Sequence, residues 1–101
     1  MTTSARSNQD AIIQQVSAVP FGQVSTYGAI AKAAGLPGYA RFVAQVLKKL
    51  PTDTKLPWHR IINAQGKISF PLSSDGYKEQ SARLISEGIT IKQGKVTVIS
   101  N

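Results

Sequence analysis

The fold of this chain depends on residues 24–49, which read VSTYGAIAKAAGLPGYARFVAQVLKK. Thr26 can cap a helix over residues 27–34, and a Gly/Pro turn at residues 35–38 leads into a second helix that ends near Lys49. The apolar residues of both helices recur at intervals of three and four, and they are Ile30, Ala31, Ala34, Ala40, Val43, Ala44 and Leu47. Two short helices joined by a tight turn that contains glycine predict a helix-turn-helix.

The neighbouring segments predict a further helix and short strands. Apolar residues recur at helical spacing over residues 10–19, where we expect a first amphipathic helix. After a loop at residues 51–57, the chain from Trp58 is expected to begin as a short turn of helix. Residues 61–62 and 68–70 are expected to pair as a small hairpin or wing.

The C-terminal part predicts one more helix and a second hairpin. The helix begins at Ser74 or Asp75 and ends near Glu87, with Gly88 supplying the left-handed residue that follows a helix. Strands over residues 89–92 and 95–99 form the hairpin.

The expected fold class is therefore mainly α with short β hairpins, as in a winged helix-turn-helix domain. We expect one domain over residues 1–101, of which residues 1–8 are flexible.

Composition excludes several kinds of chemistry. The chain has no cysteine and one histidine, which excludes disulfides, thiol catalysis and zinc fingers and argues against a histidine-rich metal site. No metal and no cofactor are therefore expected. No segment has the length and apolar character of a signal region or a membrane span, so we expect a cytoplasmic protein without a membrane partner.

The net charge of +7 is concentrated in the middle of the chain. Residues 32–67 carry seven basic side chains and one acidic side chain, whereas the rest of the chain carries five and four. Clustered lysine and arginine can be an ordinary solvated face, or they can be a site for phosphate. The overlap with the helix-turn-helix pattern favours nucleic acid.

Three motifs in order resemble the O6-alkylguanine-DNA alkyltransferases. Residues 24–31 are similar to the family's Val-x-x-Tyr-Gly-x-Ile-Ala helix, and residues 38–43 are similar to its Ala-Arg-x-Val segment. Residues 56–63, LPWHRIIN, resemble the Pro-Cys-His-Arg run that carries the alkyl-accepting thiolate. Trp58 replaces that cysteine, and an indole cannot act as the nucleophile. The chain therefore looks like an alkyltransferase-like protein, which reads damage without the transfer step.

The resemblance also implies roles for individual residues. Arg41 corresponds to the arginine that enters the base stack in place of a flipped nucleotide, and Tyr27 to the tyrosine that pushes on the target phosphate. The DNA-contacting residues it implies are Tyr27, Tyr39, Ala40, Arg41, Lys48 and Lys49. The implied lesion pocket is formed by Tyr27, Leu47, Trp58, Ile61 and Ile68, with His59, Arg60 and Glu87 as its support. A solvent-facing arginine, a packed tyrosine and a core tryptophan are the ordinary alternatives for Arg41, Tyr27 and Trp58.

Three functions remain open at this point. The first is a non-enzymatic sensor that flips O6-alkylguanine out of duplex DNA and marks it for nucleotide excision repair proteins. The second is a hydrolase or glycosylase in which His59 activates water, although the chain has only five carboxylates. The third is a plain winged-helix transcription factor, whose affinity would follow unmodified sequence.

Overall fold

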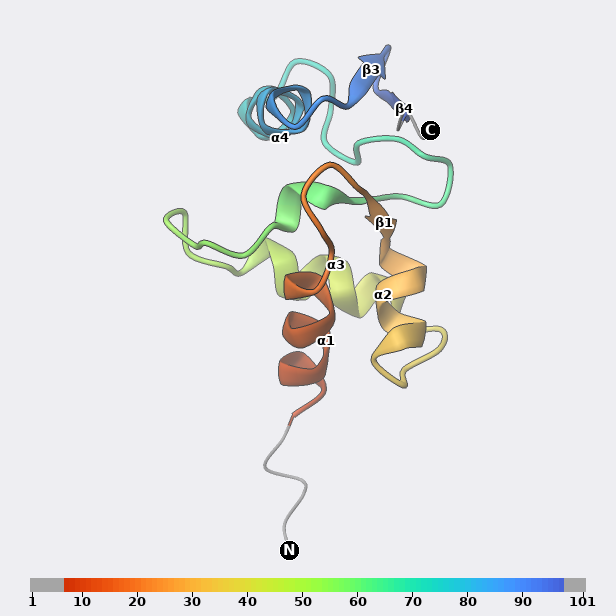
Figure 1. Ribbon diagram of the computed structural model, residues 1–101. Coiled ribbons are helices and arrows are strands. Elements are labelled where there is room, and N and C mark those ends of the chain that lie inside the picture. The colour runs from red at the N-terminus through yellow and green to blue at the C-terminus, as the bar shows by residue number, and fades with distance from the viewer. Residues whose placement is uncertain (1–6, 98–101) are drawn as a thin grey trace, which may run out of the picture.

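The N-terminal layer of the molecule is made of three helices. The computed structural model describes residues 7–97. The three helices are α1 (Asn8–Ser17), α2 (Tyr27–Ala33) and α3 (Ala40–Lys48). Figure 1 shows α3 crossing behind α1 and next to α2.

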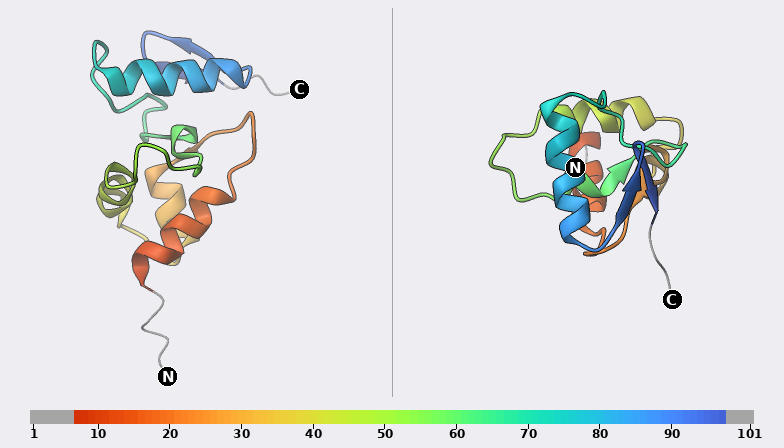
Figure 2. Two further views of the ribbon diagram at one scale, coloured as in Figure 1. Left: turned by 90° about the vertical axis from the view of Figure 1, so that its left-hand side faces the viewer. Right: turned by 90° about the horizontal axis from the view of Figure 1, so that it is seen from above.

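A second layer lies over these helices. It consists of α4 (Asp75–Ser86) and the antiparallel hairpin of β3 (Thr90–Lys92) and β4 (Lys95–Thr97). The left view of Figure 2 shows this layer separated from the three helices by the middle of the chain. That middle segment contains the 3-10 helix η2 (Trp58–Arg60) and β2 (Ile61–Ile62), which pairs in parallel with β1 (Ser25–Thr26).

Each layer has its own hydrophobic core, and β2 connects the two. The first cluster contains Ile61, together with buried residues of the three helices, and the second contains Ile62, together with buried residues of α4 and the hairpin. Successive residues of a strand point to opposite faces. Two adjacent isoleucines in β2 therefore suffice to join two cores.

The helix-turn-helix follows from local signals in the sequence. The side chain of Thr26 accepts a hydrogen bond from the Ala29 amide at 3.0 Å, which fixes the start of α2. Gly35 follows α2 with φ +81, a conformation that costs glycine little. The Leu36 amide then donates to the Ala31 carbonyl at 2.8 Å and closes the turn before α3. The predicted fold class is confirmed in these elements.

Two expectations differ from the structure. The predicted hairpin between residues 61–62 and 68–70 is wrong, because β2 pairs with β1 and Lys67 forms a bridge with Lys95. Asn63 closes a tight turn by accepting from the amides of Gln65 and Lys67, which redirects the chain toward the C-terminal hairpin. Helix α1 also begins before residue 10, because Ser7 caps it by accepting from the Asp10 amide.

The remaining elements agree with expectation. Trp58 begins a helical turn, Ser74 caps α4, and Gly88 has φ +86 after the helix ends. The flexibility expected of residues 1–8 and the strand expected at 95–99 lie partly outside the described residues. Within residues 7–97, no helix is long and apolar enough to cross a membrane.

Candidate functional site

A hollow of about 270 Å3 lies where α2, α3, η2 and the loop before α4 meet, and we call it the central hollow. Its lining is mainly apolar and also includes hydroxyl, amide and ammonium groups. The lining residues are Tyr27, Ala44, Leu47, Lys48, Trp58, Ile61, Ser69, Phe70, Pro71 and Gln80. An apolar cavity with a few polar groups is the usual form of a small-molecule or base pocket.

Tyr27 is the first residue of α2, because Thr26 caps the helix directly before it. Its side chain is half-buried, and its hydroxyl accepts a hydrogen bond from Ser69 Oγ at 3.0 Å. This contact links α2 to the loop before α4 across a separation of 42 residues. The ring thus packs against the core while the hydroxyl contacts Ser69, and the role in pushing on the target phosphate stays a prediction.

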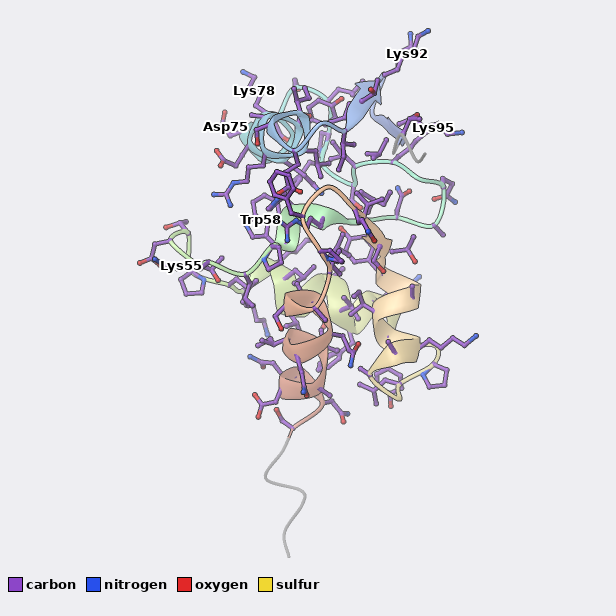
Figure 3. All side chains as sticks on the ribbon, in the orientation of Figure 1. Lys55, Trp58, Asp75, Lys78, Lys92 and Lys95 are labelled. Carbon is purple, nitrogen blue, oxygen red and sulfur yellow. The ribbon has the colours of Figure 1, made fainter. Side chains whose placement is uncertain are left out.

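Trp58 lies between the central hollow and a second one of about 490 Å3, which we call the outer hollow. Figure 3 shows Trp58 between the helical layers. The ring of Phe70 meets the indole edge-on at 6.3 Å, and the Arg83 guanidinium lies over it at 5.5 Å. Arg83 also donates to Glu79 at 2.6 Å. The indole is therefore half-buried, and it is held by contacts from the loop before α4 and from α4 itself.

The outer hollow extends from Trp58 between α3, the loop after it and α4. It shares four lining residues with the central hollow and adds Leu50, Pro51, Thr52, Thr54, Asp75, Gly76, Glu79 and Arg83. The shared residues are Leu47, Lys48, Trp58 and Phe70. A ligand that fills the central hollow thus has adjoining space bordered by both charged and apolar groups.

Glu87 is the centre of a buried polar network behind Trp58. Its side chain is 6% exposed, and its carboxylate accepts from His59 Nε2 at 2.7 Å and from Arg60 Nη2 at 2.8 Å. The Gly22 amide also donates to it at 2.9 Å, and Arg60 Nη1 donates to the Val19 carbonyl. Burial alone raises the pKa of Glu87, but the hydrogen bonds from Arg60, His59 and Gly22 outweigh burial and lower that pKa to about 2.

Gln80 adds a second anchor for η2. It is 2% exposed, and its side-chain amide donates to the carbonyls of His59 and Ile61 at 2.9 and 3.0 Å. Both anchors come from the C-terminal layer. The segment that carries Trp58 is thus held by α4 on one side and by the helical core on the other.

The basic residues of α3 lie on its surface. Arg41 is exposed in the first turn, and Tyr39, which precedes the helix, is 47% exposed and meets Phe42 edge-on. Lys48 and Lys49 are exposed at the other end of the helix. Arg41 does not line the central hollow, so any role in DNA binding has to be exercised at the surface of α3.

The structure brings most of the expected pocket residues together, with one exception. Tyr27, Leu47, Trp58 and Ile61 line the central hollow. Ile68 does not line it, and its placement in the pocket is wrong: it is 6% exposed and belongs to the core of the second layer. Its amide donates to the Gly94 carbonyl, which aligns the segment with the hairpin and turns this side chain inward.

Several lining residues were not assigned to the pocket from sequence. They are Ala44, Lys48, Ser69, Phe70, Pro71 and Gln80. Ala44 could have been found, since it precedes Leu47 by three residues on the same helical face. Gln80 gave no signal, because only the tertiary fold places its side chain under η2. The expected support residues are in place, with Glu87 bound to both His59 and Arg60.

The site contains no evident metal ligands. In the part of the chain that the structure describes, no group of three His, Cys, Asp or Glu residues is arranged to hold a metal ion. What the hollows provide instead is aromatic and aliphatic surface with a few hydrogen-bonding groups.

Comparisons with known proteins agree with this geometry. The "DNA base-flipping protein" of Vibrio parahaemolyticus is 49% identical over 89 residues, covering 87% of this chain and 84% of its own. "Alkyltransferase-like protein 1" of Schizosaccharomyces pombe is 46% identical over 82 residues, covering 81% and 76%. The crystal structure of S. pombe Atl1 in complex with damaged DNA containing O6-carboxymethylguanine matches with a TM-score of 0.82 and 39% identity, covering 98% of this chain and 93% of that one.

The family model described as "6-O-methylguanine DNA methyltransferase, DNA binding domain" matches residues 7–89. This match includes α1 to α4 and every residue of the central hollow. The chain therefore belongs to the family of the 6-O-methylguanine DNA methyltransferase DNA-binding domain, with tryptophan at position 58 and no cysteine anywhere in its sequence.

Proposed function

We propose that this protein recognises DNA damage without repairing it. It binds duplex DNA, receives a flipped O6-alkylguanine in the central hollow and holds the base without accepting its alkyl group. The name of the V. parahaemolyticus relative and the damaged DNA in the Atl1 complex support this proposal for a chain of the same fold.

The observation that carries the proposal is the side chain of Trp58. Alkyl transfer to protein requires a nucleophile such as a thiolate, and the chain contains no cysteine. An indole on the wall of the hollow supplies a stacking surface instead. Stacking of a base on an aromatic side chain contributes about 1–3 kcal/mol, which can retain an extruded base without a covalent bond.

The outer hollow extends this proposal to the alkyl group. Because Trp58 and Phe70 line both hollows, the two adjoin, and the outer hollow offers space next to the held base for a substituent on it. Arg83 offers hydrogen-bond donors there, since only its Nε is used by Glu79 among the contacts of residues 7–97. Substituents larger than methyl are thus compatible with the site.

The hydrolase alternative is disfavoured by the position of His59. A catalytic base has to reach a water molecule next to the extruded nucleotide. His59 is only 7% exposed, does not line the central hollow, and donates from Nε2 to Glu87. This arrangement supports a structural role, in which His59 ties η2 to the end of α4.

Because the protein has no group that removes the lesion, another system has to complete repair. We propose that nucleotide excision repair proteins take over the marked site. A reconstituted incision assay on an O6-alkylguanine duplex tests this step, with incision expected to increase when the protein is added. Unchanged incision over the full range of protein concentration would contradict the handover and leave lesion binding untouched.

The central experiment compares two duplexes of identical sequence, one unmodified and one with O6-methylguanine. We expect tighter binding to the modified duplex, quenching of Trp58 emission in that complex, and no protein mass increase after incubation. Affinity for both duplexes should fall with salt, because phosphate contacts supply the non-specific part. Equal affinities would refute damage recognition, and affinities that instead follow the unmodified sequence would indicate a transcription factor.

Trp58→Ala and Trp58→Phe provide matched variants for the same experiment. The alanine variant should lose most of the lesion preference, whereas the phenylalanine variant keeps a π face and should retain part of it. Both should bind unmodified DNA as the wild type does. If the alanine variant instead unfolds and wild-type emission ignores the lesion, Trp58 is a core residue and the pocket assignment is wrong.

A further inference from the structure

Three lysines form a row across the C-terminal hairpin and the segment next to it. Lys92 of β3 is the register partner of Lys95 of β4, and Lys95 is in turn the bridge partner of Lys67. All three side chains are exposed. Partners in antiparallel register point to the same face, so we call Lys67, Lys95 and Lys92 the lysine row.

The row places like charges at the closest cross-strand positions. The Ile68 amide donates to the Gly94 carbonyl, and the Val96 amide donates to the Gly66 carbonyl. These two bonds flank Lys67 and Lys95, which makes them a non-hydrogen-bonded pair with Cα atoms roughly 4.5 Å apart. Like charges in directly opposite positions destabilise a sheet. The lysine row therefore lowers the stability of the sheet, and the folding of the hairpin does not require it.

Nothing in the described structure neutralises this charge. The ion pairs within residues 7–97 join Glu87 to His59 and Arg60, and Glu79 to Arg83. No described carboxylate lies within ion-pairing distance of the lysine row. Three unpaired cations on neighbouring segments of chain favour an anionic partner with regularly spaced charges.

The position of the row connects it to the central hollow. Lys67 precedes Ser69 by two residues, and Ser69 contacts the Tyr27 hydroxyl at the rim of that hollow. From Lys67 the row continues through its bridge partner Lys95 to Lys92, and Figure 3 shows Lys92 and Lys95 reaching outward from the hairpin. The family match ends at residue 89, so Lys92 and Lys95 lie beyond the matched domain.

We propose that the lysine row binds the phosphate backbone of the duplex that flanks the flipped base. Three cations on neighbouring strands span roughly 10 Å, and one DNA strand carries a phosphate about every 3.4 Å along the helix axis. The row is thus a second backbone contact, separate from the basic residues of α3. It rests on the proposed function only in requiring that the protein binds duplex DNA.

The test measures how DNA affinity depends on salt in a double variant, Lys92→Thr/Lys95→Thr. Threonine suits an exposed strand, so the hairpin should persist. The control is Lys78→Ala, which removes a charge from α4, away from Lys95 (Figure 3). Each lost phosphate contact lowers the slope of log K against log salt by about 0.9. We expect a slope lower by about 1.8 for the hairpin variant and changed by less than about 0.5 for the control.

The slope should change on unmodified and O6-methylguanine duplexes alike. The duplex is then shortened stepwise from each end. Shortening on one side of the base only should abolish the higher DNA affinity of the wild type over the hairpin variant. The affinity of the hairpin variant itself should not change with that truncation. The melting temperature of the hairpin variant should equal or exceed that of the wild-type protein, because the substitutions relieve like-charge repulsion. If the double variant has a lower melting temperature than the wild type, Lys67→Ala, which lies outside the hairpin, provides the same measurement of the salt slope.

Equal slopes for the hairpin variant and the control would overturn the proposal and point to an acidic protein as the partner. A slope difference without any lesion preference would support phosphate binding by the lysine row and refute damage recognition. Failure of the wild type to bind duplex DNA would refute both.

Discussion

Replacement of Glu87 by glutamine should destabilise the protein in a strongly pH-dependent manner. Glutamine has the shape of protonated glutamate but leaves Arg60 without its anionic partner. The Arg60 side chain is only 15% exposed, and the loss of one partner from a buried ion pair costs about 3–5 kcal/mol. The network joins η2 to the end of α4, so the loss affects the contact between the two layers.

The magnitude follows from the pKa of Glu87, which folding lowers from 4.5 to about 2. A shift of this size corresponds to about 3 kcal/mol of stability, at about 1.4 kcal/mol per unit. Because the pKa is lowered in the folded protein, this contribution is complete above pH 4.5 and is lost as the pH falls toward 2. At pH 3, about 1 kcal/mol of it should remain.

Urea unfolding of wild type and Glu87→Gln at pH 7 and pH 3 measures this difference. The wild type should be more stable by about 3 kcal/mol at pH 7 and by about 1 kcal/mol at pH 3. Glu79→Gln is the control, because Glu79 is 56% exposed in an i,i+4 pair with Arg83 and should cost less than about 1 kcal/mol at both pH values. A wild-type advantage over Glu87→Gln that stays constant between pH 7 and pH 3 would refute the reasoning.

Three other substitutions test separate parts of the structure. Gly76→Ala would place its Cβ 2.5 Å from the Phe70 ring, so Phe70 should swing away from Trp58, which a change in Trp58 emission and weaker lesion binding would reveal. Gly28→Ala occupies the equivalent second position of α2, has no atom within 4 Å, and should raise stability by about 0.5–1 kcal/mol in urea unfolding. Arg41→Ala should weaken binding to an O6-methylguanine duplex more than to an unmodified one, and an equal loss for both would make Arg41 an ordinary phosphate contact.

Local signals in the sequence were sufficient for the helices. Thr26, Gly35 and Gly88 act through the backbone of their immediate neighbours, so the ends of α2 and α4 follow from residue type and spacing. The helix-turn-helix could therefore be predicted without knowledge of the tertiary structure. The register of the terminal hairpin around residues 93–94 was equally local.

The strand partners could not be predicted in this way. Residues 61–62 lie next to β1, which is 36 positions earlier in the chain, and Lys67 lies opposite Lys95. Such pairings depend on how the two layers stack, and two-residue strands carry too little pattern to specify a partner. Ile68 was placed in the pocket by its resemblance to the family's apolar pocket positions, and that resemblance did not show that the bridge of Lys67 with Lys95 leaves Ile68 in the core of the second layer.

The polar network gives His59 and Glu87 a structural role, which is to fix the turn that carries Trp58. A stacking platform contributes its full 1–3 kcal/mol only if it is already rigid, because ordering a mobile side chain on binding costs about 0.5–1.5 kcal/mol. The turn that carries Trp58 is fixed at its backbone by Gln80 and at its next two side chains by Glu87. A site that must hold a base by stacking alone needs this rigidity more than a site that forms a covalent bond.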